Sequence, residues 1–129
     1  MSTQFRTVES QFADFLTSVS SVDLPILSPS RFAERMQLTI QSIAERAHVH
    51  RNTVNRVPPS PAVQDYMTNA IRVLRVAMDL NGDLNRSIIW FKTSPIPDYG
   101  YRTANDLVTA GKADAVVKYL ESIMSGATG

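Results

Sequence analysis

Residues 38–57 carry the pattern that most constrains the fold of this 129-residue chain. Ala44 lies at the centre of a run in which apolar side chains recur at steps of three and four, the spacing of one face of a helix. The other apolar residues of the pattern are Ile40, Ile43, Ala47, Val49, Val54 and Val57. Two short helices joined by a tight turn at His48 would bury all of them together, so this stretch is predicted to be a helix-turn-helix.

The second helix of the predicted motif, over residues 50–57, leaves its polar side chains pointing outward. Arginine forms forked hydrogen bonds with phosphate or with a guanine edge, and asparagine pairs with adenine. These side chains predict that the second helix lies in a groove of operator DNA. The residues expected to contact the DNA are Arg46, His50, Arg51, Asn52, Thr53, Asn55 and Arg56.

Two histidines make the turn of this motif unusual. His48 stands where such turns often have glycine, and His50 stands where serine or threonine would cap the second helix better. Histidine still tolerates a left-handed backbone. A helical hairpin that only packs stays open as an alternative. A metal site is not expected, because two histidines in a chain without cysteine supply too few ligands for a closed zinc site.

The net charge of +1 hides an uneven distribution along the chain. Residues 31–57 hold five arginines against two glutamates, a balance of +3, whereas residues 1–30 carry −2 and residues 58–129 are neutral. The positive charge is thus concentrated around the predicted DNA-binding motif. One such motif makes few phosphate contacts, so a monomer would bind DNA weakly and in a salt-dependent way. We expect a homodimer that matches a two-fold operator.

Composition indicates which broad class of protein this chain belongs to: globular, secreted or membrane-spanning. Hydrophobic residues make up 43% of the chain and charged residues 19%, which is ordinary for a folded globular protein. The sequence has no cysteine, no apolar run near the roughly 20 residues that cross a bilayer, and no leader of the secretory type at its start. These features predict a cytoplasmic protein with no membrane partner.

No grouping of residues in the sequence predicts catalysis. Serine, histidine and acidic residues are scattered, so no nucleophile has a base and an orienting acid beside it. Gly111-Lys112 lacks the other residues of a phosphate-binding loop. We expect a protein that is not an enzyme and holds no cofactor.

Helical periodicity continues outside the motif, and no segment alternates apolar and polar residues as a half-buried strand does. The predicted fold is therefore all-α. An N-terminal helix over residues 4–19 has one apolar face, which either packs on the chain's own core or pairs with a second copy. Ser30 is expected to cap the helix that follows, and Thr39 is expected to cap the first helix of the motif.

A long helix over residues 62–80 is expected to join two parts of the chain. The N-terminal part, residues 1–61, contains the predicted DNA-binding and dimerisation region. The C-terminal part, residues 62–129, contains this connecting helix and a small helical unit. In that unit Thr103 and Asp106 have the spacing of a reciprocal helix cap.

The C-terminal half also holds a fixed order of short motifs. A tryptophan is followed by a proline-rich loop, a capped short helix, a glycine, and an apolar helix that ends at another glycine. The residues in this order are Trp90, Pro95, Pro97, Tyr101-Arg102-Thr103-Ala104-Asn105-Asp106-Leu107-Val108, Gly111, Val116-Val117, Leu120 and Ser125-Gly126. With the helix-turn-helix upstream, the arrangement resembles the Xre/MbcA/ParS-type antitoxins of bacterial RES-domain toxin systems, over roughly residues 32–129. The chain departs from the family at Ala104, where proline is frequent, and at Lys112-Ala113, where glycine or an acidic residue is frequent.

The resemblance implies an antitoxin that binds a RES-domain toxin, an enzyme that degrades NAD or uses it for ADP-ribosylation. It implies inhibition by occlusion of the toxin's active site, a hetero-oligomer with the toxin, and repression of the shared operon. Tyrosine and arginine are favoured interface anchors, so Tyr101 with Arg102 is the expected centre of the contact. The residues expected to bind the toxin are Tyr99, Tyr101, Arg102, Lys112, Ser125, Gly126, Ala127, Thr128 and Gly129.

Three alternatives stay open at this stage. By the resemblance the C-terminal tail approaches the toxin's NAD pocket, but chain ends commonly extend into solvent instead. The chain as a whole is alternatively a DNA-binding transcriptional repressor without a toxin partner. A third interpretation is a scaffold in which the helix-turn-helix has lost its DNA contacts.

Overall fold

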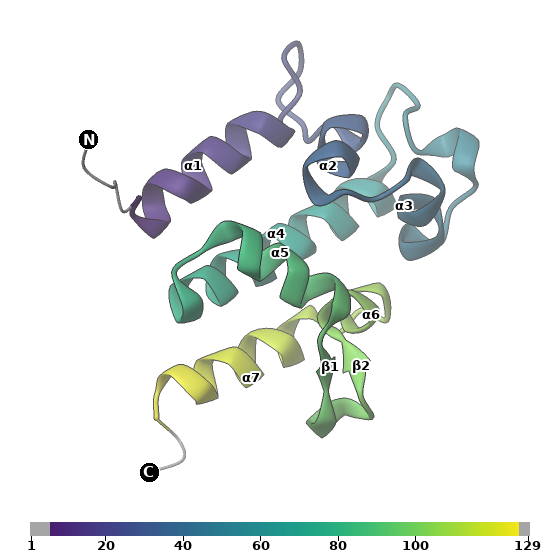
Figure 1. The fold of residues 1–129 in the computed structure, drawn as a ribbon. Coiled ribbons are helices and arrows are strands. Elements are labelled where there is room, and N and C mark those ends of the chain that lie inside the picture. The colour runs from purple at the N-terminus through teal and green to yellow at the C-terminus, as the bar shows by residue number, and fades with distance from the viewer. Residues whose placement is uncertain (1–5, 127–129) are drawn as a thin grey trace.

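The computed structural model describes residues 6–126, and within this range the chain is mostly helical (Figure 1). The α-helices are α1 (Val8–Val19), α2 (Pro29–Met36), α3 (Ile40–Ala47), α4 (Pro61–Asn81), α5 (Leu84–Thr93), α6 (Ala104–Thr109) and α7 (Ala113–Met124). Two single turns of 3-10 helix are η1 (Arg51–Thr53) and η2 (Pro97–Tyr99). The predicted α class is thus confirmed in its coarse form.

The structure adds a two-stranded antiparallel sheet that the sequence did not predict. Strand β1 (Pro95–Ile96) pairs with strand β2 (Arg102–Thr103). Each strand has only two residues, so neither is long enough to show the alternating pattern by which a strand is predicted.

Helix α4 is the centre of the molecule, and every other α-helix contacts it. In Figure 1 helices α1, α2 and α3 lie above α4, α6 and α7 lie below it, and α5 crosses in front of it. Its buried residues are Val63, Tyr66, Met67, Ala70, Ile71, Val73, Leu74, Ala77 and Met78. Because these side chains face the helices around α4, one continuous hydrophobic core draws on residues 1–61 and on residues 62–129.

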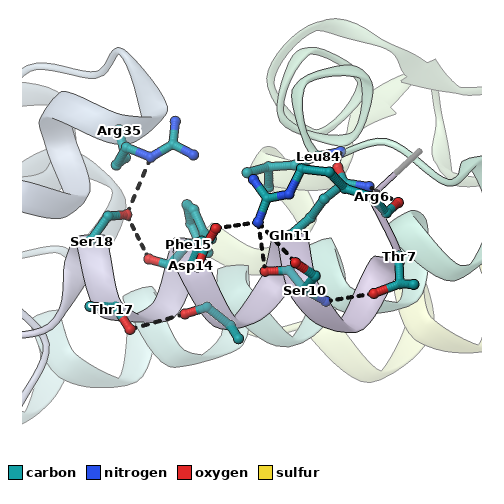
Figure 2. A network of polar contacts seen from close by, with 11 residues as sticks. Arg6, Thr7, Ser10, Gln11, Asp14, Phe15, Thr17, Ser18, Arg35 and Leu84 are labelled. Carbon is teal, nitrogen blue, oxygen red and sulfur yellow. Dashed lines mark hydrogen bonds and ion pairs between the residues drawn. The ribbon is translucent and has the colours of Figure 1, made fainter. Parts of the chain in front are cut away.

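Helix α1 packs its apolar face on the chain's own core, which is one of the two arrangements predicted from the sequence. Phe15 and Val19 are fully buried, and guanidinium groups cover the neighbouring rings, with Arg75 lying 5.3 Å from the centre of the Phe12 ring. The polar side of the helix carries a network that includes an ion pair between Arg6 and Asp14 (Figure 2).

One amide side chain fixes α1 to the turn between α4 and α5. Gln11 donates through Nε2 to the carbonyl of Gly82 at 2.9 Å and accepts through Oε1 from the backbone N–H of Leu84 at 2.9 Å. Gln11 and Leu84 lie next to each other in Figure 2. The contact binds two segments that are far apart in sequence, so α1 belongs to the same packed unit as α4 and α5.

Most helix ends follow the expected side-chain caps. Thr39 accepts from the backbone N–H of Ser42 at 3.0 Å, and Thr103 and Asp106 form the predicted reciprocal cap. The expected cap at Ser30 is wrong, because α2 begins two residues earlier and Ser28 is its cap. Pro29 occupies the first helical position, where its missing N–H costs no hydrogen bond.

Candidate nucleic-acid and partner interfaces

The turn after α3 forms as expected, with His48 in the position usually taken by glycine. His48 has a φ of 60°, and its backbone N–H bonds to the carbonyl of Glu45. The N–H of Val49 bonds to the carbonyl of Ala44 at 3.0 Å. These bonds satisfy the last carbonyls of α3 and redirect the chain.

The second helix of the motif is much shorter than predicted. In place of a helix over residues 50–57, the structure has only the 3-10 turn η1, which His50 caps by accepting from the N–H of Asn52 at 3.1 Å. Val54 is buried and anchors this turn, but Val57, which was expected in the interior, is 76% exposed. Pro58 and Pro59 follow directly and have no N–H to extend a helix. The segment is held by the buried Val54 and by local hydrogen bonds such as that from the N–H of Thr53 to the carbonyl of His50 at 2.8 Å.

The polar residues of this segment are presented to solvent. His50, Arg51, Asn52, Asn55 and Arg56 are exposed, and Thr53 is half-buried. Within residues 6–126, neither Arg51 nor Arg56 has an acidic side chain close enough for an ion pair. Both guanidinium groups are therefore free to bind an anion such as a DNA phosphate.

Arg46 lies apart from this set and contacts α6 instead. Its Nη1 donates to Oδ1 of Asp106 at 2.7 Å and to Oγ1 of Thr109 at 3.4 Å. The ring Nε2 of His48 lies 3.0 Å from the carbonyl oxygen of Thr109. The hydrogen bond from Arg46 is the main reason why the pKa of Asp106 is lowered, and bonds from Thr103 lower it further. Arg46 thus holds α3 against α6, whereas the other predicted DNA-contacting residues are exposed or, at Thr53, half-buried.

A second exposed set lies on the hairpin formed by β1, η2 and β2. Tyr101 is 70% exposed and has a φ of 63°, which is rare for a residue with a large side chain. Its N–H bonds to the carbonyl of Ile96 at 3.0 Å, and the Ile96 side chain is buried in the core. Arg102 is exposed and donates through Nε to the carbonyl of Tyr99 at 3.2 Å. The core therefore fixes the backbone of the hairpin while two anchor-type side chains face solvent.

Tyr99 also lies on the hairpin, in η2, but its side chain is half-buried against the core. The remaining expected partner residues do not gather there. Lys112 lies in the turn before α7, and Ser125 and Gly126 lie past its opposite end. A helix of 12 residues separates them, which is about 18 Å at 1.5 Å per residue. The last three predicted residues, Ala127, Thr128 and Gly129, lie outside the described part of the chain.

Further exposed apolar side chains include residues of the loop between α1 and α2, of α5, and, at the end of α7, Ile123 and Met124. Val22 is 82% exposed and Leu24 is 44% exposed in the loop between α1 and α2, and Ile89 is 59% exposed on α5. The sequence holds a signal for the exposure of Val22 and Leu24, because Val22-Asp23-Leu24-Pro25 places large apolar residues in a segment that proline excludes from a helix. Ile89 has no such signal, since its exposure depends on how α5 packs.

Comparison with models of known families, with curated proteins and with solved structures finds no match. Across residues 6–126 there is no cluster of three or more side chains suited to hold a metal ion. In the same range, none of the helices combines the length and the apolar character needed to cross a bilayer.

Proposed function

We propose that this chain is an antitoxin that binds and inhibits a RES-domain toxin and represses its own operon. The observation that carries the proposal is the presence of two separate exposed sets on one rigid core. One set is the arginine-bearing segment 50–56, and the other is Tyr101 with Arg102 on the hairpin. Figure 1 places the hairpin and η1 well apart, with α6 and the ends of α3 and α4 between them.

The hairpin has the properties of a protein-binding anchor. Tyrosine and arginine dominate the energetics of many interfaces, and an anchor held in place by its own fold loses little entropy on binding. Tyr101 meets both conditions, because its side chain is exposed while its N–H is bonded to Ile96. The exposed guanidinium of Arg102 adds a forked donor for a carboxylate of the toxin. The proposal includes occlusion of the toxin's NAD site, which the family resemblance implies, with the hairpin as the part of the described chain suited to that contact.

The segment 50–56 has the properties of a phosphate-binding surface. A single 3-10 turn presents fewer side chains to base edges than a full recognition helix does, so phosphate contacts from Arg51 and Arg56 would supply most of the affinity. Asn52 and Asn55 are exposed beside them and are suited to adenine edges. We therefore expect binding that is strongly salt-dependent and only modestly sequence-specific per copy.

Co-expression with the RES-domain enzyme of the same operon tests the proposal. The wild-type chain should co-purify with the enzyme and keep cellular NAD at its normal level. The double variant Tyr101→Ala, Arg102→Ala should no longer co-purify with the enzyme, because both anchors are removed while the core is intact. Cellular NAD should then fall, because the enzyme is no longer inhibited. A matched control, Lys118→Ala on the exposed side of α7, should behave as wild type.

The same experiment separates the second candidate function, a transcriptional repressor without a toxin partner. That candidate is favoured by the exposed Arg51 and Arg56 alone, neither of which forms an ion pair within residues 6–126, and makes no use of the hairpin. If the wild-type chain binds DNA but neither co-purifies with the enzyme nor protects NAD, the repressor is the correct assignment and the antitoxin proposal is wrong.

A further inference from the structure

The loop between α1 and α2 is an ordered projection that carries exposed apolar side chains. An antiparallel bridge between Ser20 and Leu27 closes the loop. The side chain of Gln64, on α4, binds both backbone groups of Leu27, at 3.1 Å to its N–H and 2.9 Å to its carbonyl. The loop extends from the top of the molecule in Figure 1, and Val22 and Leu24 are exposed on it.

A groove of about 240 Å³ lies beside this loop and faces the segment that follows η1. Its apolar lining comes from Leu24 and Ile26 on one side and from Val54, Val57 and Pro59 on the other. Its charged lining residues are Asp23 from the loop and Arg56 from the opposite segment. We call this loop and groove together the loop–groove face.

We propose that the loop–groove face binds the same face of a second copy of this chain and forms a two-fold symmetric homodimer. A two-fold interface requires one surface that carries both halves of the contact. The loop–groove face does so, because it has a projecting apolar loop next to an apolar hollow. Asp23 and Arg56 add opposite charges to one surface, and residues 6–126 contain no ion pair between them. Across a two-fold axis, each Asp23 would meet the Arg56 of the other copy.

The distribution of exposed apolar surface favours this face over others. Among the described residues, the two most exposed large hydrophobic side chains are Val22 at 82% and Val57 at 76%, and both belong to the loop–groove face. A contiguous exposed apolar patch with a polar rim is typical of a protein–protein interface. On α1, by contrast, Phe15 and Val19 are fully buried in the core, and Val8, Phe12 and Leu16 are partly buried against it.

The homodimer does not depend on the proposed antitoxin function. If both hold, the homodimer changes how the chain would bind operator DNA. Residues 54–59 line the groove, so the axis would lie next to η1 and the dimer would present two Arg51 side chains at one surface. In the dimer Arg56 pairs with Asp23 of the second copy, so that of the two arginines proposed above as phosphate donors only Arg51 is left for phosphate. Two phosphate-binding segments per particle would supply the affinity that one copy lacks.

Charge reversal tests the interface with the full chain alone, by sedimentation equilibrium without DNA or toxin. The wild-type chain should show a monomer–dimer equilibrium. Asp23→Arg and Arg56→Asp should each raise the dimer dissociation constant by at least about tenfold, because each variant places like charges opposite one another. An equimolar mixture of the two variants should dimerise as the wild type does, since both cross-axis pairs are then attractive. Arg86→Asp, an exposed charge change on α5, is the matched control and should leave the dimer unchanged.

Two results would overturn the homodimer. One is a wild-type chain that stays monomeric at concentrations up to about 1 mM. The other is a mixture of the two variants that associates no better than either variant alone. The recovery in the mixture also excludes misfolding as the cause of lost association, because a misfolded variant would not regain binding. A second pair of variants tests the apolar part: Val22→Asp should weaken the dimer, and Ile89→Asp should not.

Discussion

At the scale of single residues, the side chain of Asp106 connects helices that lie on either side of α4. Its Oδ2 accepts from the N–H of Thr103 at 3.0 Å and so completes the cap of α6. Its Oδ1 accepts from Arg46, on α3, at 2.7 Å. A buried hydrogen bond reinforces the same region, where the hydroxyl of Tyr66 donates to Oδ1 of Asn105 at 2.7 Å. The contact between α3 and α6 is therefore polar and specific as well as apolar.

The Asp106→Asn variant should lower the free energy of unfolding at pH 7 and lose that effect in acid. The pKa of Asp106 is lowered in the folded state, chiefly by Arg46, so the carboxylate stabilises the fold above its unfolded pKa of about 3.9. That stabilisation is lost as the pH falls through the folded pKa. The side chain is 39% exposed, so solvent screens the pair and the effect at pH 7 should be below about 1 kcal/mol.

Urea unfolding of the wild type and the variant at a series of pH values measures this difference. The gap between the two curves should close below about pH 4. Asp98→Asn on η2, where the carboxylate is exposed, is the control and should leave the stability unchanged. A gap that is constant from pH 7 into acid would show that the charge of Asp106 is not the cause.

At the scale of elements, the hairpin of β1, η2 and β2 keeps an unfavourable backbone conformation at an exposed residue, Tyr101. A large residue in the left-handed region costs about 1–2 kcal/mol relative to the ordinary helical region. The neighbouring Gly100, with a φ of 68°, makes a similar turn without that cost. The Tyr101 side chain gains little from packing, since it is mostly exposed, so its presence is better explained by a binding role than by stability.

Replacement of Tyr101 by glycine should therefore stabilise the fold while it weakens partner binding. We expect Tyr101→Gly to raise the free energy of unfolding by about 1 kcal/mol, because glycine removes the backbone cost. Tyr101→Ala keeps that cost and should leave stability near the wild-type value. Both variants should bind the RES-domain enzyme less tightly. Thermal unfolding with a binding titration would distinguish these effects, and a destabilised Tyr101→Gly would contradict the backbone argument.

The sequence predicted those elements whose formation depends on neighbouring residues. The periodic apolar faces predicted the helices, and Thr39 and Thr103 with Asp106 marked helix ends that the structure confirms. The helix over residues 50–57 was predicted from the same periodicity, but only Val54 is buried there. Whether Val54 or Val57 faces the core depends on how the segment packs on the other helices. The local sequence does not contain that information.

At the scale of the whole molecule, α4 is a buried central helix and not a spacer between two independent parts. Nine of its 21 residues are buried, and its contacts reach all six other α-helices of the described chain. The sequence predicted the length of this helix but not its position, because a wide apolar face fits either a connecting rod or a central core element. The pairing of Arg46 with Asp106 was likewise hidden, since 60 residues separate the two in sequence.

The central claim is that phosphate binding and toxin binding use separate surfaces of this one core. Binding of generic double-stranded DNA, measured by fluorescence anisotropy over a range of salt concentrations, tests it for three proteins: the wild type, Arg51→Ala, and Tyr101→Ala with Arg102→Ala. We predict that the slope of log K against log salt becomes shallower by about 0.9 per bound copy in Arg51→Ala and stays at the wild-type value in the hairpin variant. An unchanged slope in Arg51→Ala would contradict the claim. So would a slope that becomes equally shallow in the hairpin variant.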